Sequence, residues 1–230
     1  MRSAGLDLVK WTAIVTMVAD HLRYLWPGAD GLFVLGRLAF PLFCLAIAVN
    51  LGRNPVQHWT SRANLRYLGW MLAFALLSEV PYRWLDNGSQ TFSVMPTLLL
   101  GLLVAWGVQH RQWAARCLGL ASAVLATVYS PLLMYGLPGV LLPAAWLVAR
   151  RQGGLAWALV GLLAMAGNLT NSWLRQHPLA PMTLYTLASA ALAVPLGCLL
   201  LQARAGWVPK VGRWGYFFYP AHLVLLKLLA

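Results

Sequence analysis

The sequence predicts an all-α protein: a single integral membrane domain over residues 1–230, built as a bundle of about nine transmembrane helices. Of the 230 residues, 60% are apolar and only 10% are charged. A soluble domain is about 45–50% apolar and about 25% charged. The apolar residues also fall into runs close to the roughly 20 residues that a helix needs to cross a bilayer. These two observations exclude a soluble enzyme, a disordered chain and a coiled coil.

The apolar runs are separated by short segments rich in Gly, Pro, Asn or Arg. They cover residues 7–27, 31–51, 63–83, 93–109, 113–130, 132–149, 154–171, 182–202 and 212–229. The first run is too long for the core of a signal peptide and carries Asp20 and His21. We therefore expect it to remain in the protein as the first helix.

The charge distribution predicts the orientation in the membrane. The formal net charge is +12, with 17 Lys and Arg. The basic residues lie mostly between the runs, which is typical of topogenic charges and not of a nucleic-acid-binding surface. Twelve fall in one set of alternate loops: Arg2, Lys10, Arg53, Arg62, Arg66, Arg111, Arg116, Arg150, Arg151, Arg204, Lys210 and Arg213. This pattern predicts an inner-membrane protein with its N-terminus inside and its C-terminus outside.

Ionisable residues inside a predicted span cost several kcal/mol each unless they are paired or hydrated, and five of them are candidates for function. They are Asp20, His21, Arg37, Glu79 and His222. At about 1.5 Å of rise per residue, all five fall in the outer half of the bilayer. Structural readings remain open for several of them. Asp20 and Arg37 would form an ion pair between helices, Glu79 and Arg83 a pair within one helix, and His222 a hydrogen-bonded core residue.

His21 is the strongest candidate for chemistry, because an imidazole with an ordinary pKa of about 6.5 exchanges protons near neutral pH. Adjacent helical residues point about 100° apart. We therefore expect Asp20 to hold Arg37 while His21 faces a cavity. The sequence contains no soluble-enzyme signature and no spacing that indicates a metal site.

Four segments together resemble the TraX family. They read LVKWTAIVTMVADH over residues 8–21, GRLAFPLF over 36–43, LLSEVPY over 76–82 and YFFYPAHL over 216–223. The namesake of that family N-acetylates the pilin of F-type conjugative pili. The first helix also resembles that of wider membrane acyltransferases, in which a His late in the helix serves in acyl transfer. His21 is the matching position.

The resemblance implies an acetyltransferase that moves an acetyl group from acetyl-CoA to the N-terminus of a pilin subunit. His21 would act as general base, and Arg37 and His222 would polarise the thioester carbonyl. Asp20 would hold Arg37. The rival readings are a non-enzymatic pilin-assembly factor and a proton-coupled transporter.

The basic loops of the inner face suggest where the donor binds. Coenzyme A is polyanionic, and Arg62 and Arg66 offer guanidinium groups for its phosphates. An extended pantetheine arm of about 15–20 Å would then reach from the inner face to His21. We therefore expect a tunnel between that face and the histidine.

Overall fold

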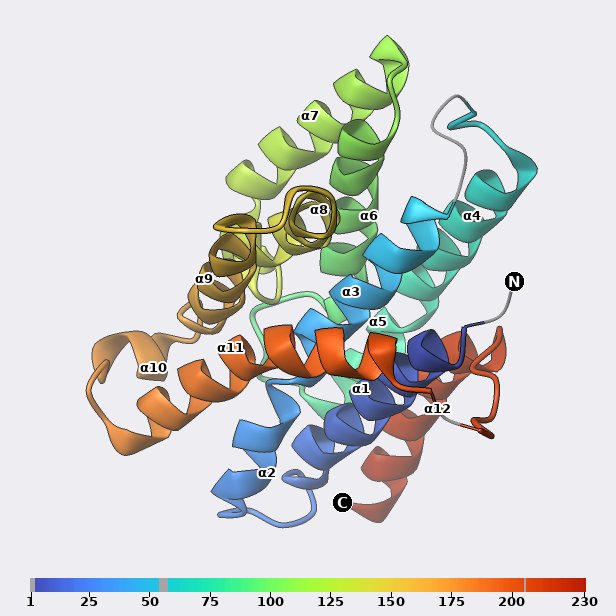
Figure 1. Cartoon of the computed structure of the whole chain (residues 1–230). Helices are drawn as coiled ribbons and strands as arrows, with labels where there is room; N and C mark the ends of the chain where they lie inside the picture. The colour runs from blue at the N-terminus through green and yellow to red at the C-terminus, as the bar shows by residue number, and fades with distance from the viewer. Residues whose placement is uncertain (1–2, 54–57, 205) are drawn as a thin grey trace.

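A computed structural model describes residues 3–53, 58–204 and 206–230, and these are helical with no strand assigned (Figure 1). Arg2 lies outside the described residues. The elements, in order, are α1 (Ala4–Leu22), α2 (Asp30–Gly36), α3 (Ala39–Gly52), α4 (Arg62–Leu77), α5 (Glu79–Leu85), α6 (Val94–Gln109), α7 (Trp113–Val128), η1 (Ser130–Leu132), α8 (Gly136–Gln152), α9 (Ala156–Asn168), α10 (Ser172–Gln176), α11 (Pro181–Gln202) and α12 (Trp214–Leu229).

Each predicted run contains a helix, but two runs that we expected to be continuous are broken. Run 31–51 is divided into α2 and α3 at Arg37 and Leu38, and run 63–83 into α4 and α5 at Ser78. A proline has no N–H and its ring clashes with the carbonyl four residues earlier. Pro41 places this disruption at Arg37, and Pro81 places it at Leu77, next to the second break. Both breaks therefore have a cause in the sequence.

Helix length and composition support only part of the expected membrane topology. Among the described residues, two helical segments are long and apolar enough to cross a bilayer, Asp30–Gly52 and Pro181–Gln202. Three further apolar helices, α6, α7 and α9, are shorter. The fold is therefore all-α with two candidate spans and several shorter apolar helices, and the count of nine spans does not follow from helix length.

The helices α6, α7, α8 and α9 form one packed group, in which α6 lies against α7 and α8, and α8 lies against α9. Close approach depends on glycine: a Cβ on Gly119 would lie 2.9 Å from the Cα of Gly107. The second group contains α1, which packs on α3, α11 and α12, and α12, which also packs on α4 and α5 (Figure 1). Helices α3 and α11 join the two groups.

The loops on one side of the molecule contact one another although they are far apart in sequence. The Tyr24 hydroxyl donates to Asp86 over 2.9 Å, and the Phe92 amide donates to the Leu132 carbonyl over 2.8 Å. A surface hollow lined by Arg23, Phe33 and Trp173 joins the turn after α1 to the segment around α10. Alternate loops of the chain thus gather on one face, which we call the histidine face because His21 lies near it.

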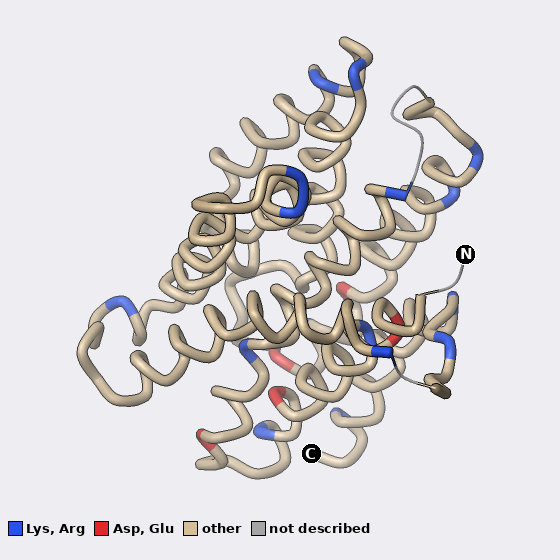
Figure 2. The backbone as a smooth tube through the Cα atoms, viewed as in Figure 1, with Lys and Arg blue, Asp and Glu red and all other residues tan. Residues whose placement is uncertain are grey.

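The remaining loops form the opposite face, which we call the basic face. The Asn64 amide and the His110 ring are 3.3 Å apart, and the Lys10 ammonium donates to the Val211 carbonyl over 3.2 Å. Arg151 joins the end of α8 to the end of α6 by donating to the Val108 carbonyl over 3.3 Å. Figure 2 shows that Lys and Arg lie mostly in turns and at helix ends.

Candidate functional site

The two histidines of the sequence hypothesis, His21 and His222, form a direct pair. His21 lies in the last turn of α1, and His222 lies in α12. The Nδ1 atom of His21 and the Nε2 atom of His222 are 2.7 Å apart, and the rings are close to parallel. His222 is only 7% exposed, whereas His21 is partly exposed. His21 is therefore the less buried member of the pair.

The hydrogen bonds of the pair fix which nitrogen of each neutral ring carries the hydrogen. The Nδ1 atom of His222 lies 3.0 Å from the Phe218 carbonyl oxygen. A carbonyl oxygen only accepts, so this nitrogen donates and the Nε2 atom of His222 is an acceptor. The Nδ1 atom of His21 must then donate to it. The Nε2 atom of His21 is left with a free lone pair, which is the state that a general base requires.

The predicted contact between Asp20 and Arg37 is confirmed. Their oxygen and nitrogen atoms are 2.5 Å apart, and both side chains are almost buried. Arg37 also donates to the Phe33 carbonyl over 3.2 Å and lies 4.1 Å from the centre of the Phe33 ring. Because Asp20 and His21 are adjacent on a helix, the ion pair and the histidine pair leave α1 in different directions.

A glycine allows the ion pair to form. Gly36 ends α2 immediately before Arg37, and a Cβ at this position would overlap the Asp20 side chain. The absence of a side chain at Gly36 therefore lets α2 approach α1 closely enough for Arg37 to reach Asp20. The sequence hypothesis quoted this glycine as part of a motif but assigned it no role.

The second predicted pair, Glu79 with Arg83, is also present. Its atoms are 2.9 Å apart, and the Arg83 side chain is half exposed. Glu79 additionally accepts a hydrogen bond of 2.9 Å from the backbone amide of Ser93, just before α6. Glu79 thus ties α5 to the start of α6, which is the structural reading of this residue.

Two tyrosines complete the surroundings of His21. The ring centres of Tyr24 and Tyr219 lie 6.4 Å and 6.5 Å from that of His21. Tyr219 precedes His222 by one helical turn and was not singled out in the sequence, although the spacing of three residues places both on one face of α12.

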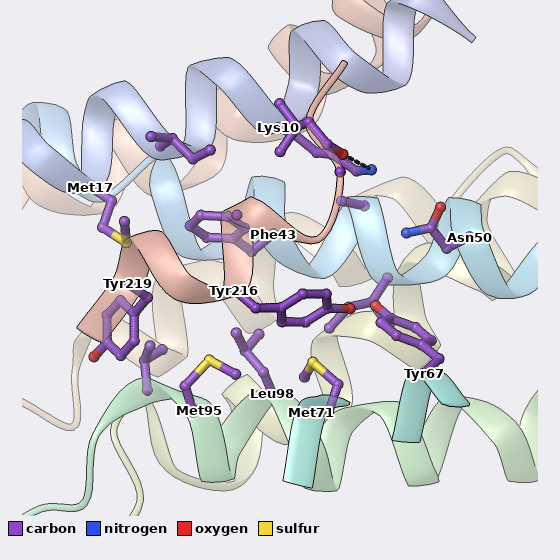
Figure 3. Close-up of a pocket in the computed structure, with 17 residues that line it drawn as sticks. Lys10, Met17, Phe43, Asn50, Tyr67, Met71, Met95, Leu98, Tyr216 and Tyr219 are labelled. Carbon is purple, nitrogen blue, oxygen red and sulfur yellow. Dashed lines mark hydrogen bonds between the residues drawn. The ribbon is translucent and has the colours of Figure 1, made fainter. Parts of the chain in front are cut away.

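A cavity lies between α1, α3, α4, α6 and α12 (Figure 3). The polar side chains Lys10, Asn50 and Tyr67 lie toward one end, and Met17, Met95 and Tyr219 lie at the other (Figure 3). His21 and His222 are not among its lining residues. Met17 precedes His21 by one turn of α1, and Tyr219 precedes His222 by one turn of α12, so the cavity ends about one helical turn from the histidine pair.

Arg62 and Arg66, the predicted phosphate-binding residues, are exposed in the first turns of α4 and do not line this cavity. The residue on this helix that does line it near the basic face is Tyr67. Lys10, which the sequence analysis treated only as a topogenic charge, is the cation that lines it.

Comparisons with known proteins give the family. The family model described as TraX protein matches residues 5–230. A Protein TraX from Escherichia coli is 28% identical over 97% of this chain and 86% of its own length, and a Protein TraX from Escherichia coli strain K12 gives the same three values. The "Probable fimbrial assembly protein FimC, serogroup H1" of Dichelobacter nodosus is 26% identical over 95% of this chain and 92% of its own. No solved structure matches significantly. Because the family model covers nearly the whole chain, the protein belongs to the TraX family.

Proposed function

We propose that this protein is an inner-membrane acetyltransferase that transfers an acetyl group from acetyl-CoA to the amino terminus of a pilin subunit. The observation that carries the proposal is the histidine pair, in which a partly exposed His21 keeps a free lone pair on Nε2 while a buried His222 holds the other ring nitrogen. Membership of the TraX family supports the same activity through the resemblance to the pilin acetylase.

The chemistry follows from what an amine needs before it attacks a thioester. The α-ammonium of the acceptor first loses one proton to solvent, because only the neutral amine has a lone pair. The amine nitrogen then bonds to the thioester carbonyl carbon, while Nε2 of His21 takes the second proton. The C–S bond breaks, and the departing thiolate takes this proton from His21. A C–N bond thus replaces the C–S bond, the products are the acetylated amine and the free thiol, and His21 returns to its neutral state.

His222 is better suited to position His21 than to touch the thioester. It accepts the Nδ1 hydrogen of His21 through its whole cycle and is itself held by the Phe218 carbonyl. This arrangement stabilises the imidazolium that forms when His21 is protonated, as the third member of a catalytic triad does. The pairing of Arg37 with Asp20 likewise favours a positioning role for both residues.

The protein would cross the membrane several times, with the basic face in the cytoplasm and the histidine face outside. The separation of the two sets of loops supports this topology, because twelve of the basic residues belong to the loops predicted inside. Reporter fusions after Arg53, Arg111 and Arg151 should all report the cytoplasm. Periplasmic signals at two of these positions would overturn the topology.

The direct test of the activity is the mass of the pilin N-terminus after co-expression with this protein. The wild type should add one acetyl group, and His21→Ala should add none at equal protein level. His21→Asn is the control of similar shape and should also be inactive. Unmodified pilin with the wild type, or acetylated pilin with both variants, would refute the proposed mechanism.

A non-enzymatic role in pilus assembly is the second candidate, and the printed name of the Dichelobacter nodosus relative favours it. An assembly factor would bind pilin without altering its mass. It would also tolerate His21→Asn in a pilus-assembly assay. The two candidates therefore give opposite results for the same variant.

A further inference from the structure

The cavity has the shape and the charge distribution of a binding site for a long, thin ligand. Its walls are mainly Met, Ile, Leu, Val and aromatic side chains, while Lys10, Asn50 and Tyr67 lie at the end toward the basic face. A ligand that fits must be apolar or amide-bearing along its length and polar or anionic at one end.

We propose that this cavity holds the phosphopantetheine arm of the thioester donor, with its phosphate at Lys10 and its thioester beside His21. This inference rests on the proposed acyl transfer and assigns the route of the donor. The arm enters from the basic face, and the acceptor amine approaches His21 from the histidine face.

The lining residues of α1 run from Lys10 to Met17, and His21 lies one turn further along the same helix. Lys10 and His21 are eleven residues apart on the same helix, which at 1.5 Å per residue places them about 16 Å apart along its axis. An extended pantetheine arm spans about 15–20 Å by the reach of comparably long chains. The phosphate and the thioester of one ligand can therefore lie at Lys10 and His21 simultaneously.

The charge at the entrance favours a phosphate. Lys10 carries three N–H donors, and one of them reaches the Val211 carbonyl over 3.2 Å, which leaves donors for a ligand. Arg53 and Lys210 lie within electrostatic range of Lys10. The Asp7 carboxylate also lies within electrostatic range of Lys10. A polyanion that arrives from the cytoplasm would therefore meet three cations and one carboxylate at this end of the cavity, which is a net positive charge.

The entrance is bordered by segment 206–213, which we call the strap. Its contacts to α1 are hydrogen bonds from the Val211 amide to Asp7 over 3.2 Å and from the Trp11 indole to the Pro209 carbonyl over 2.9 Å, in addition to the one from Lys10. Val211 and Gly212 of the strap line the cavity. The strap thus forms one wall of the proposed donor site.

Gly212→Trp tests the site with little damage to the fold, because a Cβ at Gly212 meets no atom within 4 Å. Gly206→Trp is the matched control: it lies in the same strap, is exposed, also has open space around it and does not line the cavity. Asn50→Phe narrows the cavity from the opposite wall. Each variant is first compared with the wild type for yield and thermal unfolding.

The measurement is the Kd of the purified full-length protein in lipid nanodiscs for coenzyme A, for 4′-phosphopantetheine and for holo acyl carrier protein. We expect Gly212→Trp and Asn50→Phe to weaken binding about tenfold or more by filling the ligand's space, while Gly206→Trp binds as the wild type does. Competition by 4′-phosphopantetheine identifies the arm. Binding of coenzyme A but not of the carrier protein, or the reverse, identifies the source of the thioester.

The result of this binding experiment can be distinguished from the result of the pilin acetylation test of the proposed function. His21→Asn should bind coenzyme A or the carrier protein as tightly as the wild type, because it changes the chemistry and not the cavity. If the cavity variants lose binding but no pilin is acetylated, the donor site stands and the acceptor is wrong. The donor site is wrong if none of the three probes binds or if both cavity variants bind the probes like the wild type. It is also wrong if the cavity variants lose only a bound phospholipid and keep wild-type binding of the probes.

Discussion

In the group formed by α6, α7, α8 and α9, helices meet through small residues. Gly107 faces Gly119, and Gly101 faces Pro143. In the second group, which contains α1 and α12, helices meet through charged and imidazole side chains. Arg37, at the end of α2, forms an ion pair with Asp20 of α1, and His21 of α1 hydrogen-bonds to His222 of α12. The first group gains stability from close packing, and the second carries polar groups that cost stability unless each is paired. All the residues of the proposed reaction therefore lie in the second group.

Breaking the Asp20–Arg37 pair should have the largest effect on stability. Asp20→Ala removes the carboxylate beside the nearly buried Arg37, and Arg37→Ala leaves Asp20 with the more distant Arg23, 3.7 Å away. Removing one partner of a buried ion pair costs about 3–5 kcal/mol in protein interiors, and we expect Asp20→Ala to reach this range more fully. We expect the double variant to be less destabilised than the sum of the single variants. The free energy of unfolding in detergent measures all three. Strict additivity would show that the two side chains do not stabilise each other.

The His222→Leu variant should have the next largest effect, on turnover. Leucine offers no acceptor for the Nδ1 hydrogen of His21, so His21 loses its fixed orientation, and we expect kcat to fall about a hundredfold, the lower part of what a general base contributes. The KM for the acyl donor should not change. Phe218→Leu is the control, because it keeps the backbone carbonyl that holds His222. Equal falls in both variants would assign the effect to packing.

Gly119→Ala should destabilise the protein without altering the proposed chemistry, and it therefore tests whether the two groups of helices have different roles. Its Cβ would lie 2.9 Å from the Gly107 Cα, where only a backbone shift makes room, and such overpacking costs about 1–3 kcal/mol. Gly161→Ala in α9 is the matched control, because its Cβ meets nothing within 4 Å. Thermal unfolding and kcat per folded molecule are the measurements. A fall in kcat for Gly119→Ala would contradict the separation.

Arg83→Gln should have the smallest effect. The Arg83 side chain is half exposed, and exposed ion pairs contribute about 0.2–1 kcal/mol. Glu79 retains its hydrogen bond from the Ser93 amide, so α5 should stay attached to α6. Unfolding and pilin acetylation should both remain close to wild type. A large loss of acetylation would give this pair a part in the reaction.

The contacts that the sequence predicted are those fixed by spacing or depth. Glu79 and Arg83 are four residues apart on a helix, and Asp20 and Arg37 share a depth on neighbouring helices. The contact between His21 and His222 joins residues 201 positions apart, and no periodicity in the sequence specifies which helices become neighbours. The predicted pairs are therefore confirmed, whereas the histidine pair became visible only in the structure. A cavity was expected, but its lining was not: Lys10 lines it, and Arg62, Arg66 and His21 do not.

Pro41 and Pro81 stand four residues after Arg37 and Leu77 and explain the two helix breaks, but they do not predict them. Pro143, Pro195 and Pro220 lie inside the unbroken helices α8, α11 and α12, so the sequence alone does not tell which proline ends a helix. A hydropathy window counts proline as one more residue in an apolar run and does not register the lost hydrogen bond. The catalytic roles of His21, Asp20, Arg37 and His222 and the use of acetyl-CoA stay predictions, since they depend on a reaction and not on a contact.

The contact of Gly36 with Asp20 has a consequence for how this protein can evolve. The two residues belong to motifs far enough apart in sequence to mutate independently, yet any side chain at position 36 would occupy the space of the Asp20 side chain. A side chain at position 36 must therefore be accompanied by a smaller residue at position 20 or by a shift of α2 away from α1. Among natural relatives we expect positions 20, 36 and 37 to vary together or to remain fixed together, as a single inherited unit.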